Sequence, residues 1–273
     1  MKFTDLNLSD PILRALEDQK YEKPTPIQAE VIPTILNNSD VMAAAQTGTG
    51  KTAGFVLPIL SKLSNPKNNY KGHQLRALIL TPTRELAAQV RESVNTYSKY
   101  LSIRSTAVYG GARIHNQQLK LRKGVDVLVA TPGRLLDLYN QKSVNFKNIE
   151  IFVLDEADQM LDLGFFPAIK RVYKNLPEKK QSVFISATML KPVRALANEF
   201  LVDPEEINLS PRATPIKKIR QKLIFVNREA KLEKLADVIE EEKIYQAIIF
   251  TKTKIGADKL ALALKKNKIK ASK

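Results

Sequence analysis

Residues 45–52, Ala45-Gln-Thr-Gly-Thr-Gly-Lys-Thr52, follow the apolar run VMAAA (41–45) and have the spacing of a phosphate-binding loop. Ala45 takes the place of the first glycine of the strict pattern. Strand-forming residues precede the glycines and a helical pattern follows them, which is the order that such a loop requires. The stretch therefore predicts a nucleotide-binding α/β fold, although a ligand-free glycine turn between a strand and a helix would give a similar local pattern.

The chemistry of this loop assigns a role to its residues. Glycines let backbone N–H groups curl around a phosphate, and the helix that follows points its positive end at the anion. Lys51 is expected to neutralise the terminal phosphates, and the Thr52 hydroxyl is expected to bind Mg²⁺. The loop residues expected to contact the nucleotide are Gln46, Thr47, Gly48, Thr49, Gly50, Lys51 and Thr52.

Five more short apolar runs alternate with helical patterns after the loop. One of these patterns places Leu86, Val90, Val94 and Tyr97 at helical spacing. Strands that alternate with crossover helices predict a doubly wound α/β domain with a parallel sheet. The further strands are expected in ALILT (77–81), STAVY (105–109), DVLVA (126–130), IFVL (151–154) and SVFIS (182–186).

Polar or glycine-rich clusters stand where these strands end. Ligands of open parallel sheets bind outside the carboxyl ends of the strands, so the clusters are expected to share one rim with the phosphate loop. The clusters are PTREL (82–86), GGA (110–112), TPGR (131–134), DEAD (155–158) and SAT (186–188).

Two acidic residues follow the apolar strand IFVL (151–154). Beside a phosphate loop, Asp155 is expected to be the metal carboxylate of a phosphate-loop ATPase. Glu156, one residue along, is expected to orient or deprotonate the attacking water. Without the phosphate loop, the same residues would be explained as the N-cap of a helix.

Composition and charge limit the class of protein. The 273 residues are 44% hydrophobic, contain no cysteine and carry a formal charge of +16. No apolar run reaches the roughly 18 residues of a membrane span and the first residues lack a signal-peptide pattern, so a cytoplasmic protein without membrane contact is expected. The charge favours a polyanionic partner such as nucleic acid, or else it reflects a lysine-rich composition without a ligand.

Residues 203–221 break the pattern with a charged, proline-containing stretch that predicts a linker. A second α/β pattern follows, with strands expected in KLIFV (222–226) and AIIFT (247–251). Two strand–helix units are close to the lower size limit for an independent core. The predicted division is a nucleotide-binding domain over 1–206, a linker over 207–220 and an incomplete second α/β domain over 221–273.

The whole chain resembles the DEAD-box ATP-dependent RNA helicases of superfamily 2, because the motifs occur in that family's order and include its name string, Asp155 to Asp158. The resemblance implies a RecA-like fold of the P-loop NTPase class, with the first domain complete and the second cut short. It implies ATP and Mg²⁺ as cofactors, RNA as the partner, and ATP hydrolysis coupled to local separation of RNA duplexes. Lys51, Asp155 and Glu156 would be the catalytic residues.

The segment YEKPTPIQ (21–28) resembles the family's adenine-reading Q motif. The resemblance implies that Gln28 contacts the adenine edge, that Tyr21 packs on the base in place of the usual phenylalanine, and that Thr25 belongs to the same site. Phe3 falls where the family has an upstream aromatic residue. The residues alone predict a helix start instead, with Thr25 as N-cap and Gln28 at the third position of a capping box, and both interpretations can hold together.

Three clusters of the first domain resemble the family's contacts to the RNA backbone, which do not depend on base identity. Turn and helix-cap chemistry is the better explanation of each cluster alone, but three such clusters on one rim with a phosphate loop weaken it. Phe250 and Thr251 match a further RNA-binding motif, or they form the end of a buried strand. Ser186 and Thr188 match a motif that couples ATP state to RNA binding, and their hydroxyls are expected to bond Asp158. The RNA-binding residues implied in the first domain are Pro82, Thr83, Arg84, Gly110, Gly111, Thr131 and Arg134.

The sequence shows none of the family's later second-domain motifs, among them a catalytic arginine pair. An arginine supplied across the site speeds phosphoryl transfer by about three to five orders of magnitude, so this chain is expected to bind ATP, to bind RNA weakly and to unwind no duplex efficiently. A DNA helicase or another phosphate-loop translocase is a competing interpretation, and a non-catalytic fragment that binds ATP or RNA is a second. A monomer is expected, and no protein partner is indicated.

Overall fold

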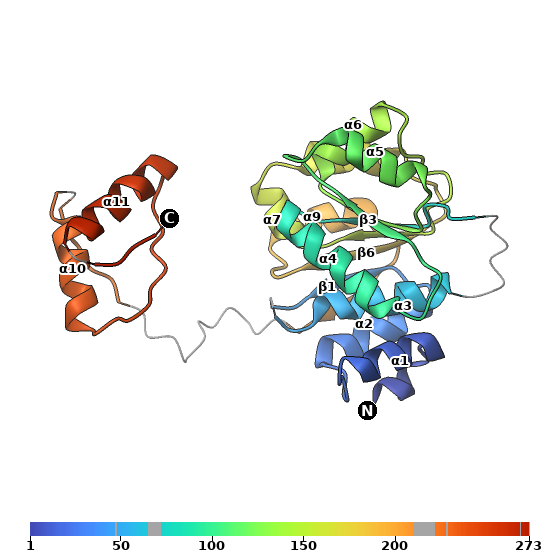
Figure 1. Ribbon diagram of the computed structural model, residues 1–273. Coiled ribbons are helices and arrows are strands. Elements are labelled where there is room, and N and C mark those ends of the chain that lie inside the picture. Colours follow the sequence, from blue (N-terminus) through green and yellow to red (C-terminus); the bar gives the residue numbers. More distant parts are fainter. Residues whose placement is uncertain (47, 65–71, 210–221, 228, 268, 273) are drawn as a thin grey trace. The chain divides into compact units, whose positions relative to one another are not determined.

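The computed structural model describes residues 1–46, 48–64, 72–209, 222–227, 229–267 and 269–272 (Figure 1). The chain divides into two compact units, Met1–Ala213 and Thr214–Lys273. Thr47, one of the residues expected to contact the nucleotide, lies outside the described residues, and so does most of the expected linker. Within the described ranges, no helix has the length and apolar character needed to cross a membrane.

A seven-stranded sheet forms the centre of the first unit. Its strands are β1 (Val41–Ala44), β2 (Ala77–Leu80), β3 (Ser105–Val108), β4 (Val127–Ala130), β5 (Ile151–Leu154), β6 (Gln181–Ser186) and β7 (Glu205–Asn208). The order across the sheet is β3-β4-β2-β5-β6-β1-β7, and all neighbouring pairs are parallel. The six predicted strands and the doubly wound parallel sheet are confirmed.

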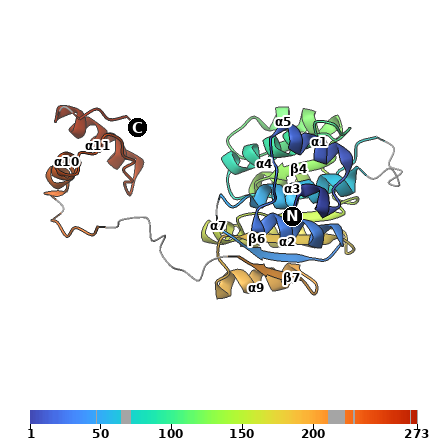
Figure 2. The ribbon, with the colours of Figure 1, turned by 90° about the horizontal axis from the view of Figure 1, so that it is seen from below.

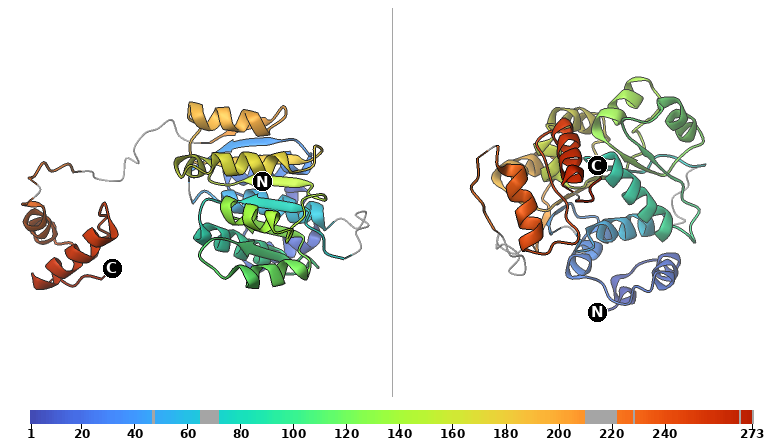
Figure 3. Two further views of the ribbon diagram at one scale, coloured as in Figure 1. Left: turned by 90° about the horizontal axis from the view of Figure 1, so that it is seen from above. Right: turned by 60° about the vertical axis from the view of Figure 1, so that its left-hand side comes forward.

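Helices connect these strands and cover both faces of the sheet (Figure 2). Their bounds are η1 (Phe3–Leu6, a 3-10 helix), α1 (Asp10–Asp18), α2 (Pro26–Leu36), α3 (Lys51–Leu63), α4 (Arg84–Tyr97), α5 (Ile114–Arg122), α6 (Pro132–Asn140), α7 (Ala157–Asp162), α8 (Phe166–Lys174) and α9 (Lys191–Phe200). Figure 3 shows the same layers from two other directions.

Alternating strand side chains divide the core into two layers. Ile79 of β2 packs in the layer that holds residues of α1–α4, whereas Leu78 and Leu80 pack in the layer that holds residues of α5–α9. Both faces of the sheet are therefore buried. This explains why the strands read as continuous apolar runs rather than as alternating patterns.

Strand β7 lies where the sequence predicted a linker. It pairs in parallel with β1 at the edge of the sheet, and Ile207 is its buried residue. An edge strand tolerates polar side chains because part of it faces solvent. The prediction of a linker from residue 203 is therefore wrong for Glu205–Asn208.

The second unit contains α10 (Lys231–Glu241) and α11 (Lys254–Lys266) and no strand among its described residues. The strands predicted over 222–226 and 247–251 are wrong. A strand is held by hydrogen bonds to a neighbouring strand, and in the described part of this unit neither segment pairs with one. The expectation of a buried strand end also fails, because Phe250 is 90% exposed.

Candidate active site

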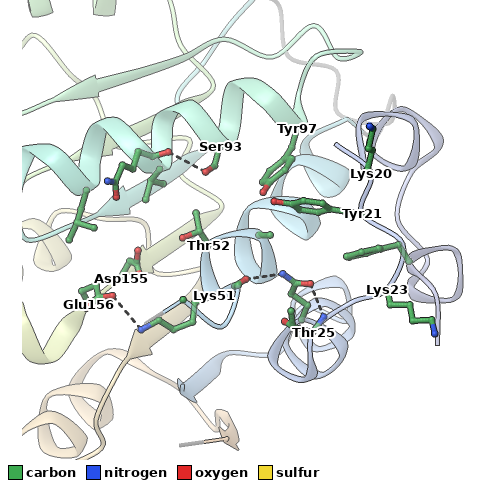
Figure 4. A pocket seen from close by; sticks show the side chains of 18 of the residues that line it. Lys20, Tyr21, Lys23, Thr25, Lys51, Thr52, Ser93, Tyr97, Asp155 and Glu156 are labelled. Atoms are coloured by element: carbon green, nitrogen blue, oxygen red, sulfur yellow. Dashed lines mark hydrogen bonds and ion pairs between the residues drawn. The ribbon is translucent and has the colours of Figure 1, made fainter. Parts of the chain in front are cut away.

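The parallel sheet brings the carboxyl ends of its strands to one rim, where a cavity of about 640 Å³ lies (Figure 4). Its walls come from the N-terminal segment, the start of α2, the phosphate loop, α4 and the two residues after β5. Lys51, Thr52, Asp155 and Glu156 all line it. The volume is typical of small-molecule sites, which span about 300–1,000 Å³.

Two glycines with left-handed backbone conformations shape the phosphate loop. Gly48 has φ 84° and Gly50 has φ 90°, values that other residues adopt only at a cost. Gly50 is the N-cap of α3, whose first residue is Lys51. Inside the loop, the Thr49 hydroxyl donates to the Gln46 carbonyl at 2.7 Å. The positive end of α3 and the Lys51 ammonium therefore lie together, as binding of an anion requires.

Lys51 forms an ion pair with Glu156 at the wall of this cavity. Lys51 Nζ lies 3.4 Å from Glu156 Oε1, and the two side chains are 6% and 17% exposed. Such a pair is screened less by solvent than a pair at the surface. A nucleotide phosphate would compete with the Glu156 carboxylate for the ammonium, because both are anions.

Asp155 is buried at the end of β5, and its backbone N–H donates to the Leu80 carbonyl at 3.0 Å. Burial, followed by the neighbouring Glu156 carboxylate, raises the pKa of Asp155 to about 7, and Lys51 opposes this shift. A divalent cation beside Asp155 would favour the charged carboxylate. Asp155 and the Thr52 hydroxyl supply the oxygen donors that Mg²⁺ prefers.

The site supplies two neighbouring carboxylates, those of Asp155 and Glu156. Among the described residues, no group of three or more His, Cys, Asp or Glu side chains forms such a site. Magnesium is commonly held by one or two carboxylates together with substrate phosphates. The donor set therefore fits a magnesium ion that arrives with a nucleotide.

Glu156 has a strained backbone. Its φ of 57° and ψ of 48° are left-handed, which is unusual for a residue other than glycine. Such strain persists only where the surrounding structure imposes it, and it is concentrated at functional sites. Glu156 occupies the N-cap position of α7, but its side chain makes no capping hydrogen bond and pairs with Lys51 instead. A simple helix cap therefore does not explain this residue.

Gln28 connects the start of α2 to the phosphate loop. Its Oε1 accepts from the Thr25 backbone N–H at 3.0 Å, and its Nε2 donates to the Gly50 carbonyl at 3.1 Å. The capping contact from Gln28 back to Thr25 is thus present, as the residues alone predicted. Thr25 Oγ1 is buried and has no hydrogen-bond partner among the described residues. Contact of Gln28 with an adenine stays a prediction.

Three aromatic rings lie together at the other end of the cavity (Figure 4). Phe3 stacks on Tyr21 with ring centroids 6.5 Å apart, and Tyr21 is tilted against Tyr97 at 6.4 Å. Burial and the nearby Tyr21 phenol raise the pKa of Tyr97. The sequence placed Tyr97 on the apolar face of its helix but did not assign it to the site. The helical spacing predicted that this face of α4 is buried, but it carried no signal that part of the face lines the cavity.

The clusters expected to face RNA meet around the loop at residues 110–112. Arg84 Nη1 lies beside Gly111, and Arg134 Nη1 donates to the Ala112 carbonyl at 3.0 Å. The Arg84 side chain is largely exposed, whereas that of Arg134 is only 13% exposed. Arg134 therefore stabilises the loop at residues 110–112, whereas the Arg84 guanidinium faces solvent.

The remaining residues of these clusters differ in accessibility. Gly110 is exposed, while Pro82 and Thr131 are buried. The Thr83 hydroxyl caps α4 by accepting from the Leu86 backbone N–H at 3.3 Å. Helix capping thus explains Thr83 by itself, and contacts of all these residues with RNA stay predictions.

Asp158 and Thr188 are bonded as expected. Asp158 Oδ2 accepts from the Thr188 backbone N–H at 3.0 Å and from its hydroxyl at 3.1 Å. Ser186 is fully buried, and its hydroxyl oxygen accepts from the Thr188 N–H at 3.4 Å rather than bonding Asp158. Phe250 and Thr251 belong to the second unit, where the Thr251 hydroxyl donates to the Thr253 carbonyl at 2.9 Å.

Comparisons with known proteins agree with this geometry. The model of the DEAD/DEAH box helicase family matches residues 25–196. The DEAD-box ATP-dependent RNA helicase CshA of Bacillus cereus is 38% identical over 262 residues, which are 96% of this chain and 49% of that protein. The ATP-dependent RNA helicase DeaD of Escherichia coli is 42% identical over 266 residues, which are 97% of this chain and 42% of that protein. The chain thus spans about half the length of these relatives or less.

Proposed function

The chain belongs to the DEAD/DEAH box helicase family, and on that premise we propose that it is the nucleotide-binding part of an ATP-dependent RNA helicase. The observation that carries the proposal is the cluster of Lys51, Asp155 and Glu156 beside the phosphate loop, in one cavity at the rim of a parallel sheet. The relatives named as ATP-dependent RNA helicases support it. The monomeric state and cytoplasmic location expected from the sequence belong to the same proposal.

ATP binds with its phosphates at the N-terminus of α3 in this proposal. Lys51 exchanges its Glu156 partner for phosphate oxygens, which frees the Glu156 carboxylate. Asp155 and Thr52 would hold Mg²⁺, which would neutralise charge on the phosphates. The left-handed backbone of Glu156 fixes the position of its carboxylate at the site. This carboxylate orients the attacking water and accepts its proton.

The adenine occupies the aromatic end of the cavity. The Tyr21 side chain is exposed, and its ring offers a surface on which the adenine can stack. Gln28 lines the same cavity, and its amide, which donates to the Gly50 carbonyl, is the group proposed to contact the base. Thr25, the N-cap of α2, holds the start of that helix at the wall of the same cavity.

RNA binds along the rim through its backbone. Arg84, Gly110 and Gly111 present a guanidinium and accessible backbone there, and Arg134 holds their loop in place. Contacts of this kind go to phosphates and sugars and carry little base preference. The bonds between Asp158 and Thr188 join the segment after β5 to the segment after β6, which provides a route from the nucleotide to the RNA.

Hydrolysis assays test this proposal. Steady-state ATP turnover is measured with single-stranded RNA, with DNA of the same sequence and without nucleic acid, for the wild type and Glu156→Gln, together with Mg·ATP binding by calorimetry. The proposal expects both proteins to bind Mg·ATP, and any RNA-stimulated turnover to disappear in Glu156→Gln. Equal stimulation by DNA would favour a DNA translocase, and turnover unchanged in Glu156→Gln would remove Glu156 from the reaction.

A further inference from the structure

A second group of cations lies away from the rim that holds the nucleotide site. A cleft of about 640 Å³ opens at the edge strand β3, between α4 and the end of α5. Four cations line it: Arg91 of α4, Arg104 just before β3, Lys120 of α5 and Lys123, the C-cap of α5. Because Arg104 precedes β3, the cleft lies toward the amino ends of the strands, opposite the rim.

No acidic residue balances these charges. The residues lining the cleft include no Asp or Glu, and none of the four cations forms an ion pair with any residue in the described part of the chain. Other surface cations do have carboxylate partners, as with Lys170 and Glu199 at 2.7 Å. The cleft therefore keeps an unneutralised positive potential, which attracts an anion.

Two acids flank the cleft residues along the chain, and neither lines the cleft. Glu92, next to Arg91, lines a different pocket beside Tyr97. Asp126 is buried, and its Oδ2 accepts from the Arg104 backbone N–H at 2.8 Å and lies 2.6 Å from His73 Nδ1. The Arg104 side chain is also fixed, because its Nη1 donates to the Lys123 carbonyl at 2.9 Å. The Arg104 guanidinium is thus held at the backbone of Lys123 without a counterion.

Arg91 provides independent evidence that the cleft accepts a hydrogen-bond acceptor. Its Nε is a buried donor with no hydrogen-bond partner among the described residues. Nearby Asn95, one turn along α4, has its Oδ1 occupied by the Ser105 hydroxyl at 2.6 Å. A buried donor without an acceptor is costly, and an anionic oxygen in the cleft would remove that cost.

We propose that this cleft binds the phosphodiester backbone of RNA, as a second RNA contact that does not need ATP. The choice of RNA as the polyanion rests on the proposed function. The cleft offers guanidinium and ammonium groups from both sides of an edge strand, and phosphate oxygens are the acceptors that match them. Protection of a sheet edge by lysine explains exposed cations but not the buried Arg91 Nε. An acidic peptide added to β3 is the competing ligand, and it would have only the four residues of that strand to pair with.

Charge reversal at the exposed lysines tests the proposal. Lys120→Glu/Lys123→Glu and the control Lys174→Glu/Lys179→Glu change the net charge equally, and all four lysines are exposed. Binding of a fluorescent 25-nucleotide RNA is measured without ATP over a salt series. The cleft variant should bind RNA at least about tenfold more weakly, and the slope of log affinity against log salt concentration should become shallower by about two. The control should keep an RNA affinity within about twofold of the wild type. Arg91→Gln should weaken binding by about threefold to tenfold.

Three outcomes would overturn the proposal. The first is unchanged RNA affinity in the cleft variant, and the second is an equal loss in the control, which would show a general effect of net charge. The third is displacement of the RNA by poly-glutamate as effectively as by unlabelled RNA, which would make the ligand an acidic polypeptide. Mg·ATP binding is measured on the same proteins. Its absence in the wild type would count against the proposed function, whereas unchanged RNA affinity with intact ATP binding would count against the cleft alone.

Discussion

The two compact units of this chain differ in how they use apolar side chains. In the first unit, seven paired strands bury apolar residues on both faces of the sheet. In the described part of the second unit, Leu264 is the one buried residue, and Leu223 and Phe225 are largely exposed. Similar apolar runs are therefore buried in the first unit and exposed in the described part of the second. Strand propensity produces a sheet, and a site at its rim, only where neighbouring strands are present.

The largest difference between the two units is expected in the free energy of unfolding when one phenylalanine in each is replaced by alanine. Phe152 of β5 is 1% exposed, whereas Phe225 is 91% exposed. Phe152→Ala should lower the free energy of unfolding by about 3–5 kcal/mol, because it leaves a cavity in the core. Phe225→Ala should change it by less than about 0.5 kcal/mol. Urea unfolding followed by circular dichroism measures both, and a large loss in Phe225→Ala would show that the second unit packs as tightly as the first.

A smaller change in stability tests whether packing of the first unit also constrains the backbone of the phosphate loop. Gly50 has φ 90°, and a Cβ added there would overlap the Gln28 amide nitrogen. Gly50→Ala should therefore destabilise the first unit by about 1–3 kcal/mol. Gly133 lies in the first turn of α6 with open space around it, so Gly133→Ala should be neutral or stabilising by up to about 1 kcal/mol. Thermal melts of both variants check this, and equal melting temperatures would refute a rigid loop.

Two helix caps sharpen the comparison further. The Thr83 and Thr253 hydroxyls each accept a backbone N–H from the third residue of their helix, at 3.3 Å and 3.0 Å. Replacement by alanine should cost about 1 kcal/mol in each helix. In Thr83→Ala the cost should reduce global stability, because α4 packs on the sheet. In Thr253→Ala it should increase only local amide exchange in α11, and a matching loss of global stability would contradict the difference between the units.

The smallest effect concerns pH. Burial lowers the pKa of Lys62 to about 8 from its ordinary 10.5. Between these pH values the unfolded chain holds a proton that the folded chain has lost, so the free energy of unfolding rises with pH from 8 to 10.5. Solvent screening limits the rise to about 1 kcal/mol.

Denaturation at pH 7, 8, 9 and 10 measures this rise. Lys62→Met should flatten the pH dependence, although it also loses the bond to Gln181 Oε1 at 2.5 Å at every pH. The exposed Lys259 of the second unit supplies the control, and Lys259→Met should keep the wild-type slope. A wild-type slope in Lys62→Met would assign the pH dependence to another group.

The sequence predicted those parts of the fold that local pattern determines. Six of the seven strands were visible as short strand-forming runs, and the phosphate loop and the Asp155–Glu156 pair were visible as short motifs. Strand β7 was missed because its edge position requires only Ile207 to be apolar. The strands of the second unit were predicted from propensity alone, which cannot show whether a partner strand exists.

Within the site, the sequence identified residue types better than their surroundings. It did not assign Tyr97 to the cavity, because a helical apolar stripe does not reveal which flank lines a pocket. It also grouped Arg134 with Arg84, although only the structure separates the bracing arginine from the exposed one. The strain at Glu156 has no signature in the sequence, since it depends on the backbone path between β5 and α7.

The most direct test of the account is calorimetric binding of Mg·ATP to the wild type, to Lys51→Ala and to the surface control Lys174→Ala. The nucleotide phosphates are expected on the Lys51 ammonium at the start of α3, within the first unit. Lys51→Ala should weaken binding by about 100-fold, which corresponds to about 2.7 kcal/mol, and Lys174→Ala should bind like the wild type. Equal affinity of Lys51→Ala and the wild type would contradict the assignment of this rim as the ATP site.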